Sequence, residues 1–319
     1  MKRAALLVLG LGATFFVFGC QYVAPNDPNE NIENTSDGND DGGPRDSPRP
    51  DGAELLFSAY TPSEPNSSAQ NAAFSPDGTR VVFTLFLSGY NLGPAELWIM
   101  NVDGSNAHRI TPAEDQDNVN VPGAAWNGVT GEIVFASDRG DSDDIWAMHA
   151  DGSGIRRVTT HTPPPFWIEP VWSPDGEWIA FEADTESQTE LAQRGTIYKV
   201  RFDGTELTQL TKRDAEGFDD RLPNWSPGGD RILFQRRIPH DEDTDGDNWD
   251  IYAMDTDGDN PFNVSNARHL FNTDNSWSPD GRWIASSSAF QVGGEPLPRS
   301  NIIAFFVPDP DLDEEVPAP

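Results

Sequence analysis

Apolar and polar residues alternate in short stretches along most of this chain, and turn-forming residues separate the stretches. The segment VWSPDGEWIAF (171–181) is typical, because apolar letters stand on both sides of Ser-Pro-Asp-Gly. A proline that fixes φ, followed by Asp and Gly, suits a tight connection between antiparallel strands. The flanking β-branched and aromatic residues are those that strands favour. The segment therefore predicts a strand, a turn and a second strand.

The same pattern occurs five times in register. The copies are FSPDGTRVVF from Phe74, WNGVTGEIVF from Trp126, WSPDGEWIAF from Trp172, WSPGGDRILF from Trp225 and WSPDGRWIAS from Trp277. A second pattern follows four of them, as ELWIMNVDG, DIWAMHADG, TIYKVRFDG and DIYAMDTDG, and each leads into a further short strand-like stretch. One repeat thus predicts four short antiparallel strands. Because such a sheet cannot bury both faces alone, repetition at this period indicates an all-β protein whose blades stack around an axis, a β-propeller.

The two ends of the repeat region predict the number of blades. After the fifth copy, NIIAFFVPDP (301–310) aligns with the third strand of the other repeats, and no fourth strand follows. DGAELLFSA (51–59) begins with the Asp-Gly that precedes every fourth strand. We therefore expect five four-stranded blades, closed by pairing of 51–59 with 301–307, which removes a free sheet edge. Six blades, one of them degenerate, is the alternative, although residues 60–70 supply too few strands for it.

The repeat W-S-P-D-G-x-x-I-A-F, followed by I-Y-x-M-x-x-D-G and a closing L-T, resembles the propeller repeat of the TolB family. The same repeat is found in the propellers of dipeptidyl-peptidase-type enzymes. The resemblance covers about residues 51–310. It implies a propeller and, through TolB, a role in the bacterial envelope with docking on a protein partner. TolB carries an extra α/β domain and typically six blades, so this chain departs from it in organisation. Since propellers host many functions, the resemblance implies no activity by itself.

The amino-terminal residues predict export and lipid anchoring. Lys2 and Arg3 precede an uncharged apolar run over 4–18, and the run leads to Cys20. Residues 1–20 therefore have the layout of a secretory signal, too short to remain as a spanning helix. Their end resembles the bacterial lipoprotein signal, which implies a lipid on Cys20; an ordinary signal with a chance cysteine is the alternative. In that family Gln21 is compatible with the outer membrane.

Composition then divides the rest of the chain. Residues 21–50 are dense in Asn, Asp, Pro, Gly and Ser, and they have too little apolar area to offset the entropy of folding. They predict a disordered acidic linker. Residues 51–310, roughly 260 in number, suffice for one large propeller domain, and 311–319 form an acidic tail. Because Cys20 is the only cysteine, the exported domain would have neither a disulfide nor a cysteine nucleophile.

The charge of the chain restricts the class of partner. Against 53 Asp+Glu stand 21 Lys+Arg, which gives a formal net charge of −32. An acidic surface disfavours binding to nucleic acid and to anionic membranes, and it suits a cation, a basic partner or a salty habitat. A solvated acidic surface without a ligand is the simpler interpretation. We expect a monomer that has no nucleic-acid partner and meets the membrane through the lipid on Cys20.

Known catalytic patterns are absent from the sequence. It contains no G-x-S-x-G and no H-E-x-x-H, and no hydrolase-sized region follows the propeller. The aspartates of the repeats, such as Asp77 and Asp175, are expected to form turns, and the repeat tryptophans to pack between blades. The histidines, whose spacing does not indicate a metal site, are His108, His149, His161, His240 and His269. No catalytic residue is predicted.

The segment HDEDTDGDNWD (240–250) is the most pointed candidate for a metal site. Its aspartates alternate around Gly246, which resembles the first half of a calcium-binding loop. The candidate ligands are Asp241, Asp243, Asp245, Asp247 and Asp250. Tyr252 stands where such a loop has a glutamate, so Asp250 would have to close the shell. Calcium is therefore the one cofactor that the sequence indicates, and a solvated acidic loop is an equal alternative.

Long and varied connections lie, by propeller topology, on the face opposite the short Ser-Pro-Asp-Gly and Asp-Gly turns. We call these two sides the loop face and the turn face. Binding residues are often carried by loops on a rigid scaffold. In THTPPPFWIEP (160–170), two aromatic residues beside a proline run either cover a blade end or contact a partner. The candidate partner-binding residues are Phe166, Trp167, Glu169, Asp220 and Asp274, of which the last three are expected to make the mouth of the central channel acidic.

These observations predict a lipid-anchored, non-enzymatic propeller of the cell envelope that binds a protein or peptide with its loop face. The first alternative is a carbohydrate-active or hydrolytic enzyme that uses a cation at the mouth of the channel. The second is a calcium-stabilised structural module. An enzyme requires acid, base or metal groups that converge on a bound substrate, so the arrangement of the loop-face side chains separates the first two.

Overall fold

The structure is a computed structural model of the 319-residue chain. It describes residues 66–89, 94–112, 119–120, 125–140, 143–161, 166–184, 195–212, 218–238, 248–265, 270–292 and 295–307. All of these belong to the second of two compact units, Glu54–Pro319. The predicted signal, linker, closing strand 51–59 and acidic tail lie outside the described residues. In the part that is described, no helix is long and apolar enough to cross a membrane.

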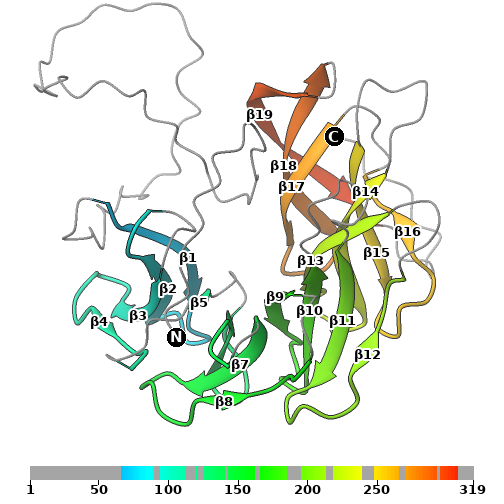
Figure 1. The fold of residues 1–319 in the computed structure, drawn as a ribbon. Coiled ribbons are helices and arrows are strands. Elements are labelled where there is room, and N and C mark those ends of the chain that lie inside the picture. Colours follow the sequence, from blue (N-terminus) through cyan, green and yellow to red (C-terminus); the bar gives the residue numbers. More distant parts are fainter. Residues whose placement is uncertain are drawn as a thin grey trace, which may run out of the picture. The chain divides into compact units, whose positions relative to one another are not determined.

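Five successive blades form along the chain, one for each sequence repeat, and the strands of the last two make one seven-stranded sheet (Figure 1). The first blade contains β1 (Ser68–Phe74), β2 (Arg80–Phe86), β3 (Ala95–Asn101) and β4 (His108–Arg109). The second contains β5 (Val119–Asn120), β6 (Glu132–Ser137), β7 (Asp144–His149) and β8 (Arg156–Arg157). The third contains β9 (Phe166–Trp172), β10 (Trp178–Asp184), β11 (Thr196–Arg201) and β12 (Thr208–Gln209).

The last two blades follow the same order. The fourth contains β13 (Asp219–Trp225), β14 (Arg231–Ile238), β15 (Asn248–Asp255) and β16 (Phe262–Asn263). The fifth contains β17 (Leu270–Trp277), β18 (Trp283–Val292) and β19 (Glu295–Phe306). Neighbouring strands within each blade pair antiparallel, and one parallel bridge between Trp249 and Phe271 joins the fourth sheet to the fifth. The fold is therefore a five-bladed β-propeller, as the repeats predict.

The serine of each Ser-Pro turn holds that turn together. Ser75 Oγ donates to Asp77 Oδ1 at 2.6 Å and accepts from the backbone N–H of Arg80 at 2.9 Å. This bond from Ser75, with further bonds from Thr79, lowers the pKa of Asp77 to about 2. In the fourth blade, where the sequence reads Ser-Pro-Gly-Gly-Asp, Ser226 Oγ donates to Asp230 instead, at 2.6 Å. The aspartates of these turns thus have the turn-forming role that the sequence predicts.

The second blade replaces this serine with an asparagine that reaches the next blade. Asn127 Oδ1 accepts from the backbone N–H groups of Val129 and Thr130, at 2.8 and 3.0 Å. Its Nδ2 donates to the carbonyl of Gly176, in the turn of the third blade, at 3.1 Å. Because Asn127 is fully buried, water does not replace these bonds. The copy that departs most from the repeat therefore gains a link between two blades.

We expect Asn127→Ser to keep the turn but lose this link. Serine occupies the position in the other blades and bonds only within its own turn. The buried carbonyl of Gly176 would lose its donor, which costs about 1–2 kcal/mol. In a domain of this size that lowers the melting temperature by about 2–8 °C. Thermal unfolding followed by circular dichroism measures the change, and an unchanged melting temperature would contradict a stabilising role for the link.

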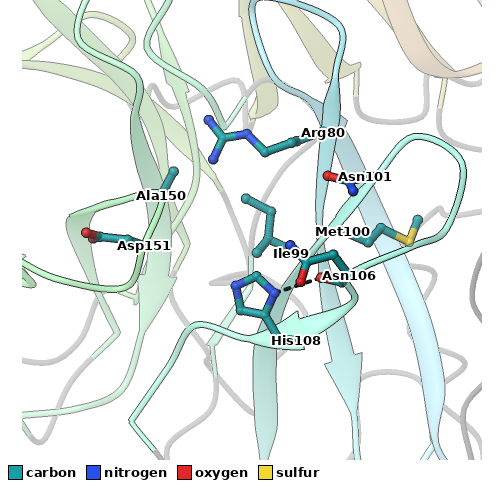
Figure 2. A pocket seen from close by; sticks show the side chains of 8 residues that line it. All are labelled: Arg80, Ile99, Met100, Asn101, Asn106, His108, Ala150 and Asp151. Atoms are coloured by element: carbon teal, nitrogen blue, oxygen red, sulfur yellow. Dashed lines mark hydrogen bonds between the residues drawn. The ribbon is translucent and has the colours of Figure 1, made fainter.

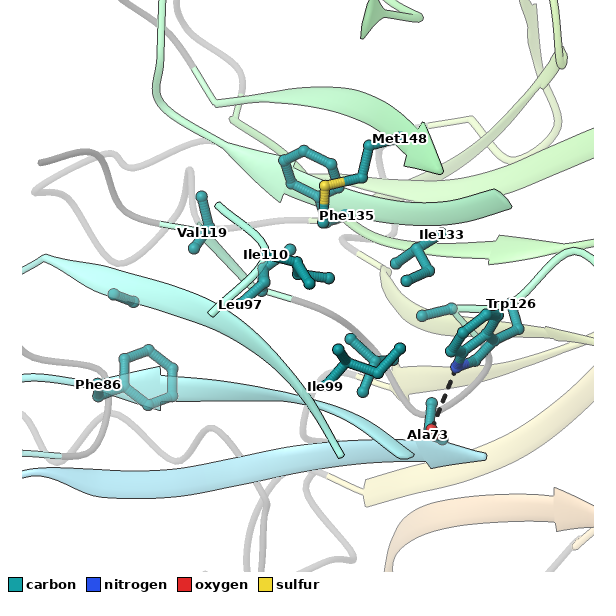
Figure 3. Close-up of a cluster of buried hydrophobic side chains, with 13 residues drawn as sticks. Ala73, Phe86, Leu97, Ile99, Ile110, Val119, Trp126, Ile133, Phe135 and Met148 are labelled. Carbon is teal, nitrogen blue, oxygen red and sulfur yellow. Dashed lines mark hydrogen bonds between the residues drawn. The ribbon is translucent and has the colours of Figure 1, made fainter. Parts of the chain in front are cut away.

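The hydrophobic core lies between consecutive blades. In Figure 3, Leu97 and Ile99 of β3 pack with Trp126, Ile133 and Phe135 of the second blade. Equivalent clusters join the second blade to the third, the third to the fourth and the fourth to the fifth. The repeat tryptophans of blades two to four are buried in these clusters, which confirms their predicted packing role. Burial of apolar area between blades thus stabilises sheets that could not bury both faces alone.

The first and last blades each expose a large apolar side chain at a position that is buried in other blades. Phe74 aligns with the buried repeat tryptophans, but it is 69% exposed. Ile302 of β19 aligns with Ile145 and Ile251, which are fully buried, but it is 78% exposed. The described residues of the neighbouring blades therefore do not cover these two side chains. The predicted closing strand 51–59 lies outside the described ranges, so its pairing with 301–307 stays a prediction.

The Asp-Gly turns touch the preceding blade. Gly204 has φ +84°, and a Cβ built on it would lie 2.5 Å from the carbonyl oxygen of Val158, at the end of the second blade. Gly258 repeats the arrangement in the fourth blade, where a Cβ would lie 2.6 Å from the carbonyl oxygen of Leu210. Only glycine combines a left-handed backbone with so close an approach. These glycines therefore set the spacing of neighbouring blades on the turn face.

Candidate functional site

Charged side chains gather between the third and fourth blades. They come from β9, β10 and β13, and we call them the carboxylate–arginine cluster: Glu169, Glu182, Asp184, Asp219 and Arg221. Asp184 is the last residue of β10 and Asp219 the first of β13. Since both strand ends lie opposite the turns, the cluster stands at the loop-face end of the two blades.

A bulge in each inner strand shapes the place where the cluster forms. Glu169 in β9 and Leu222 in β13 have φ of +50° and +52°, three residues before the repeat tryptophan of their blade. The pairing of β9 with β10 and of β13 with β14 shifts register at these points. Such bulges bend a strand and redirect its side chains. At the second bulge, the backbone N–H of Leu222 donates to Glu182 Oε2 at 3.2 Å.

Arg221 bonds to one carboxylate of the cluster and lies near two others. Its Nε donates to Asp219 Oδ1 at 2.8 Å, and its Nη1 lies 3.5 Å from Asp184 Oδ2 and 3.8 Å from Glu182 Oε1. The backbone N–H of Gly195 also donates to Asp219 Oδ1, at 2.7 Å. The planar guanidinium can serve several carboxylates because its donors point in fixed, different directions. Arg221 is therefore the centre of the cluster.

The cluster is closed on one side and open on the other. The side chains of Glu182 and Asp219 are each 2% exposed, whereas those of Asp184 and Arg221 are 21% and 28% exposed. Two buried oxygens, Glu182 Oε1 and Asp184 Oδ1, have no hydrogen-bond partner among the residues that the structure describes. Buried polar atoms are nearly always bonded, so these two require an explanation.

Burial and neighbouring charges change the protonation of the cluster. Burial raises the pKa of Glu182 to about 8; Arg221 opposes the rise, and the nearby carboxylates of Asp184, Asp219 and Glu169 add to it. Burial also raises the pKa of Asp219 above its usual value, against the effect of Arg221. Although burial acts against the charge of Arg221, the surrounding carboxylates raise its pKa, so it stays charged. At neutral pH Glu182 therefore carries a proton.

The three acidic residues that were predicted at the channel mouth lie in different surroundings. Glu169 belongs to the cluster. Asp220 is buried and accepts two bonds from Arg236, from Nε at 2.6 Å and from Nη2 at 2.8 Å. This bidentate pair opposes the charge of Asp220, so its part in an acidic channel mouth stays a prediction. Asp274 lies in β17, and its side chain is outside the described part of the chain.

Trp167 covers the end of a blade. It is 5% exposed, stacks on His161 with ring centroids 4.3 Å apart, and lies 5.1 Å from the ring of Phe181. Of the two alternatives for this tryptophan, burial favours packing at the blade end, and contact with a partner stays a prediction. Phe166 is only half-buried and pairs with Asp184 through the backbone, so it stands next to the cluster and stays a candidate.

Most of the predicted calcium segment lies outside the described residues, namely Asp241, Asp243, Asp245 and Asp247. Asp250 is described and buried, and its two oxygens accept bonds from Asn263 Nδ2 at 2.6 Å and Ser265 Oγ at 2.9 Å. These bonds attach the fourth strand of the blade, so Asp250 has a structural role without calcium. In the described ranges, no three His, Cys, Asp or Glu residues are grouped as a metal ion requires.

Calcium binding by the segment stays a prediction. Calorimetric titration of the protein with calcium is expected to release or absorb heat, and Asp243→Ala or Asp245→Ala is expected to abolish that heat, because each removes an oxygen ligand. A titration without heat would exclude the calcium loop.

A pocket on the turn face lies between the first two blades (Figure 2). Arg80, Ile99, His108, Ala150 and Asp151 are among the residues that line it.

At the equivalent place of the next two interfaces a basic side chain crosses to the following blade: Arg156 donates to the carbonyl of Phe202 at 2.7 Å, and Lys199 to that of Thr256 at 2.6 Å. In the first blade, Ile99 stands at the position of Lys199, and His108 stands at the position of Arg156. His108 Nδ1 donates to the backbone carbonyl of Asn106, within its own blade. The pocket is therefore a place where a crossing side chain is missing.

Comparison with known proteins agrees with the repeats. The profile of the TolB beta propeller domain matches residues 61–243. The uncharacterized protein Atu1656 of Agrobacterium fabrum is 27% identical over 228 residues, which cover 68% of this chain and 69% of that protein. The Tol-Pal system protein TolB of Anaeromyxobacter dehalogenans is 30% identical over 106 residues, which cover 33% of this chain and 22% of that protein.

A solved structure of an oligogalacturonate lyase in complex with manganese is similar with a TM-score of 0.50 and 16% identity. The match covers 78% of this chain and 67% of the lyase, and at this identity it concerns the fold alone. The profile match is the stronger finding, because it spans more than half of the chain and includes four of the five repeats. This chain therefore belongs to the TolB β-propeller domain family.

Proposed function

We propose that this chain is a lipid-anchored propeller of the bacterial cell envelope, and that it binds a protein or peptide and is not an enzyme. The observation that carries the proposal is the way in which loop-face carboxylates are fixed. Asp184 and Arg221 are partly exposed, and Arg221 is fixed by its bond to the buried carboxylate of Asp219. A rigid, charged surface favours selective binding, because little entropy is lost when a partner docks on it.

The family supports a binding role in the envelope. A relative that matches part of this chain is the TolB of a Tol-Pal system. The predicted signal over 1–20 and the polar linker over 21–50 fit an exported domain that is tethered to a membrane. Gln21 favours the outer membrane as the place of the anchor.

We expect Cys20→Ser to release the chain from membranes. Without the thiol no lipid can be attached, and the polar linker has no other apolar anchor once the signal is removed. Cells labelled with radioactive palmitate and then fractionated should show label on the membrane-bound native chain and none on the variant. Gln21→Asp is the control, because it keeps the cysteine and should keep the label. Equal labelling of the serine variant would contradict the anchor.

Crosslinking and capture from membranes test the binding role. Asp184→Lys reverses a partly exposed charge on the loop face, and Glu177→Lys reverses one on the turn face, where Glu177 is 53% exposed. The native chain and the Glu177 variant should capture the same protein, and the Asp184 variant should lose it. The same capture by all three chains would contradict the loop face as the binding surface.

A second function is favoured by one observation. Four carboxyl groups converge at the loop face, and burial raises the pKa of one of them, Glu182, which is typical of groups that transfer protons. This arrangement supports the carbohydrate-active or hydrolytic alternative. Assays with a panel of polysaccharides and peptides, with and without calcium or manganese, would decide. Turnover by the native chain that disappears in Glu182→Gln would replace the scaffold proposal.

A further inference from the structure

We propose that the carboxylate–arginine cluster binds a single basic side chain, a lysine or an arginine, that the partner inserts from the open side of the cluster. This inference rests on the proposed binding function and names the chemistry that the partner presents. The geometry points to it through the two buried oxygens that lack a donor, Glu182 Oε1 and Asp184 Oδ1.

Once Glu182 is ionised, the cluster contains more acceptors than its own donors satisfy. Arg221 makes a close bond only to Asp219, at 2.8 Å, while it lies 3.5 Å from Asp184 and 3.8 Å from Glu182. A buried acceptor without a donor loses its hydration and gains nothing in return. A second cation that carries N–H groups would supply the missing donors. It can enter where Asp184 and Arg221 are partly exposed.

The arrangement suits an organic cation better than a metal ion. A calcium ion needs six to eight oxygens close to one point, and the described carboxylates are not grouped in that way. Arg221 already stands among them. An ammonium or guanidinium group carries several N–H donors that point apart, so it can bond to two separated oxygens beside Arg221.

The equivalent place between the first two blades shows that the cluster is not a general property of the repeat. There Asn71, Thr84 and Asn120 occupy the positions of Glu169, Glu182 and Asp219. Asn71 Nδ2 donates to Asn120 Oδ1 at 2.7 Å, and Thr84 Oγ1 lies 3.2 Å from the same oxygen. Those three residues are uncharged and bond to one another. The third and fourth blades replace them with acids, and one oxygen of these, Glu182 Oε1, has no hydrogen-bond partner in the described residues.

Binding should be linked to a proton. The charged groups that face Glu182 are Arg221, Asp184, Asp219 and Glu169. A second cation favours the ionised form of Glu182, so its arrival at neutral pH releases a proton. Since the pKa of Glu182 is about 8 without the ligand, the affinity should increase as the pH rises from 6 to 8.

The probe is Nα-acetyl-lysine methylamide, with the norleucine analogue as its neutral match. Binding to the full chain is followed by the NMR signal of the Trp249 indole, whose ring centroid lies 5.9 Å from Arg221 Cζ. Proton release is measured by calorimetry in buffers of different ionisation enthalpy. The lysine probe should bind more tightly at pH 8 than at pH 6, and the norleucine probe should not bind. Asp184→Asn should weaken binding at least tenfold, and Glu182→Gln should abolish the proton release.

Glu177→Gln is the matched control, because it removes one carboxylate from the turn face and leaves the cluster intact. Absence of binding, equal binding of the norleucine probe, or an equal loss in Glu177→Gln would overturn the inference. If Glu182→Gln does not fold, Asp184→Asn decides, since Asp184 is partly exposed. A partner that is captured from membranes by a chain that fails to bind lysine would overturn this inference and leave the proposed function standing.

Discussion

Alanine in place of Gly204 is expected to destabilise the propeller by about 3 kcal/mol, and the same change at Gly78 by about 1 kcal/mol. Both glycines have left-handed backbones, with φ of +84° and +68°. A Cβ costs about 1 kcal/mol in that conformation. At Gly204 it would also lie 2.5 Å from the carbonyl oxygen of Val158, so the two blades would have to move apart. At Gly78 it would meet nothing within 4 Å.

The comparison of the two variants isolates the contact between blades from the strain of the backbone. For a domain of this size, 3 kcal/mol corresponds to a fall in melting temperature of about 6–12 °C. Equilibrium unfolding in urea would give the two free energies directly. Equal losses at both positions would mean that the approach of the Asp-Gly turn to the preceding blade contributes nothing to stability.

Removal of the arginine at the centre of the cluster is the second change with a large expected effect. Arg221→Met should lower the free energy of unfolding by about 3–5 kcal/mol, because it leaves buried carboxylates without their cation. The control is Arg201→Met. Arg201 also has two carboxylate partners, Glu177 and Glu206, but these pairs are exposed to solvent, so we expect a much smaller loss than for Arg221→Met.

The loss in Arg221→Met should depend on pH. In the native chain the pKa of Glu182 is raised to about 8, so the folded state keeps a proton that the unfolded state releases near its usual pKa of 4.5. Stability therefore falls as the pH rises between these two values. Arg221 opposes the rise in pKa, so without it the fall should extend to higher pH. The variant should lose more stability at pH 9 than at pH 5, measured by urea unfolding at both. A loss independent of pH would contradict the assigned protonation of Glu182.

The fold could be predicted because each of its elements is specified locally. Ser75, Asp77 and the following glycine fix a turn through bonds within six residues, and the alternation on either side fixes the strands. Repetition of that unit then leaves stacking as the way to bury both faces. Even the irregular second copy keeps its turn, since Asn127 accepts from the backbone N–H groups two and three residues on, where serine elsewhere accepts from the one five residues on.

The candidate site was harder to predict because its members come from different blades. Glu182 is separated by about forty residues from Leu222, whose backbone bonds to it. A signal did exist, since the other repeats have Thr84, Ala136, Gln235 and Ser287 at this inward position and only the third has a charge. Arg221 as its partner could not be read from local spacing. Whether aromatic residues beside a proline run face inward or outward also depends on tertiary contacts, here the stacking of Trp167 on His161.

The exposed Phe74 and Ile302 have a mechanical consequence. In the described ranges the junctions between consecutive blades are sealed by apolar side chains from both neighbours, so whatever covers Phe74 and Ile302 decides how easily the ring opens between its ends. The predicted closing strand 51–59 would connect this junction to the linker. On that prediction, a pull through the proposed anchor on Cys20 would load this strand first, and its separation would open the ring at that point.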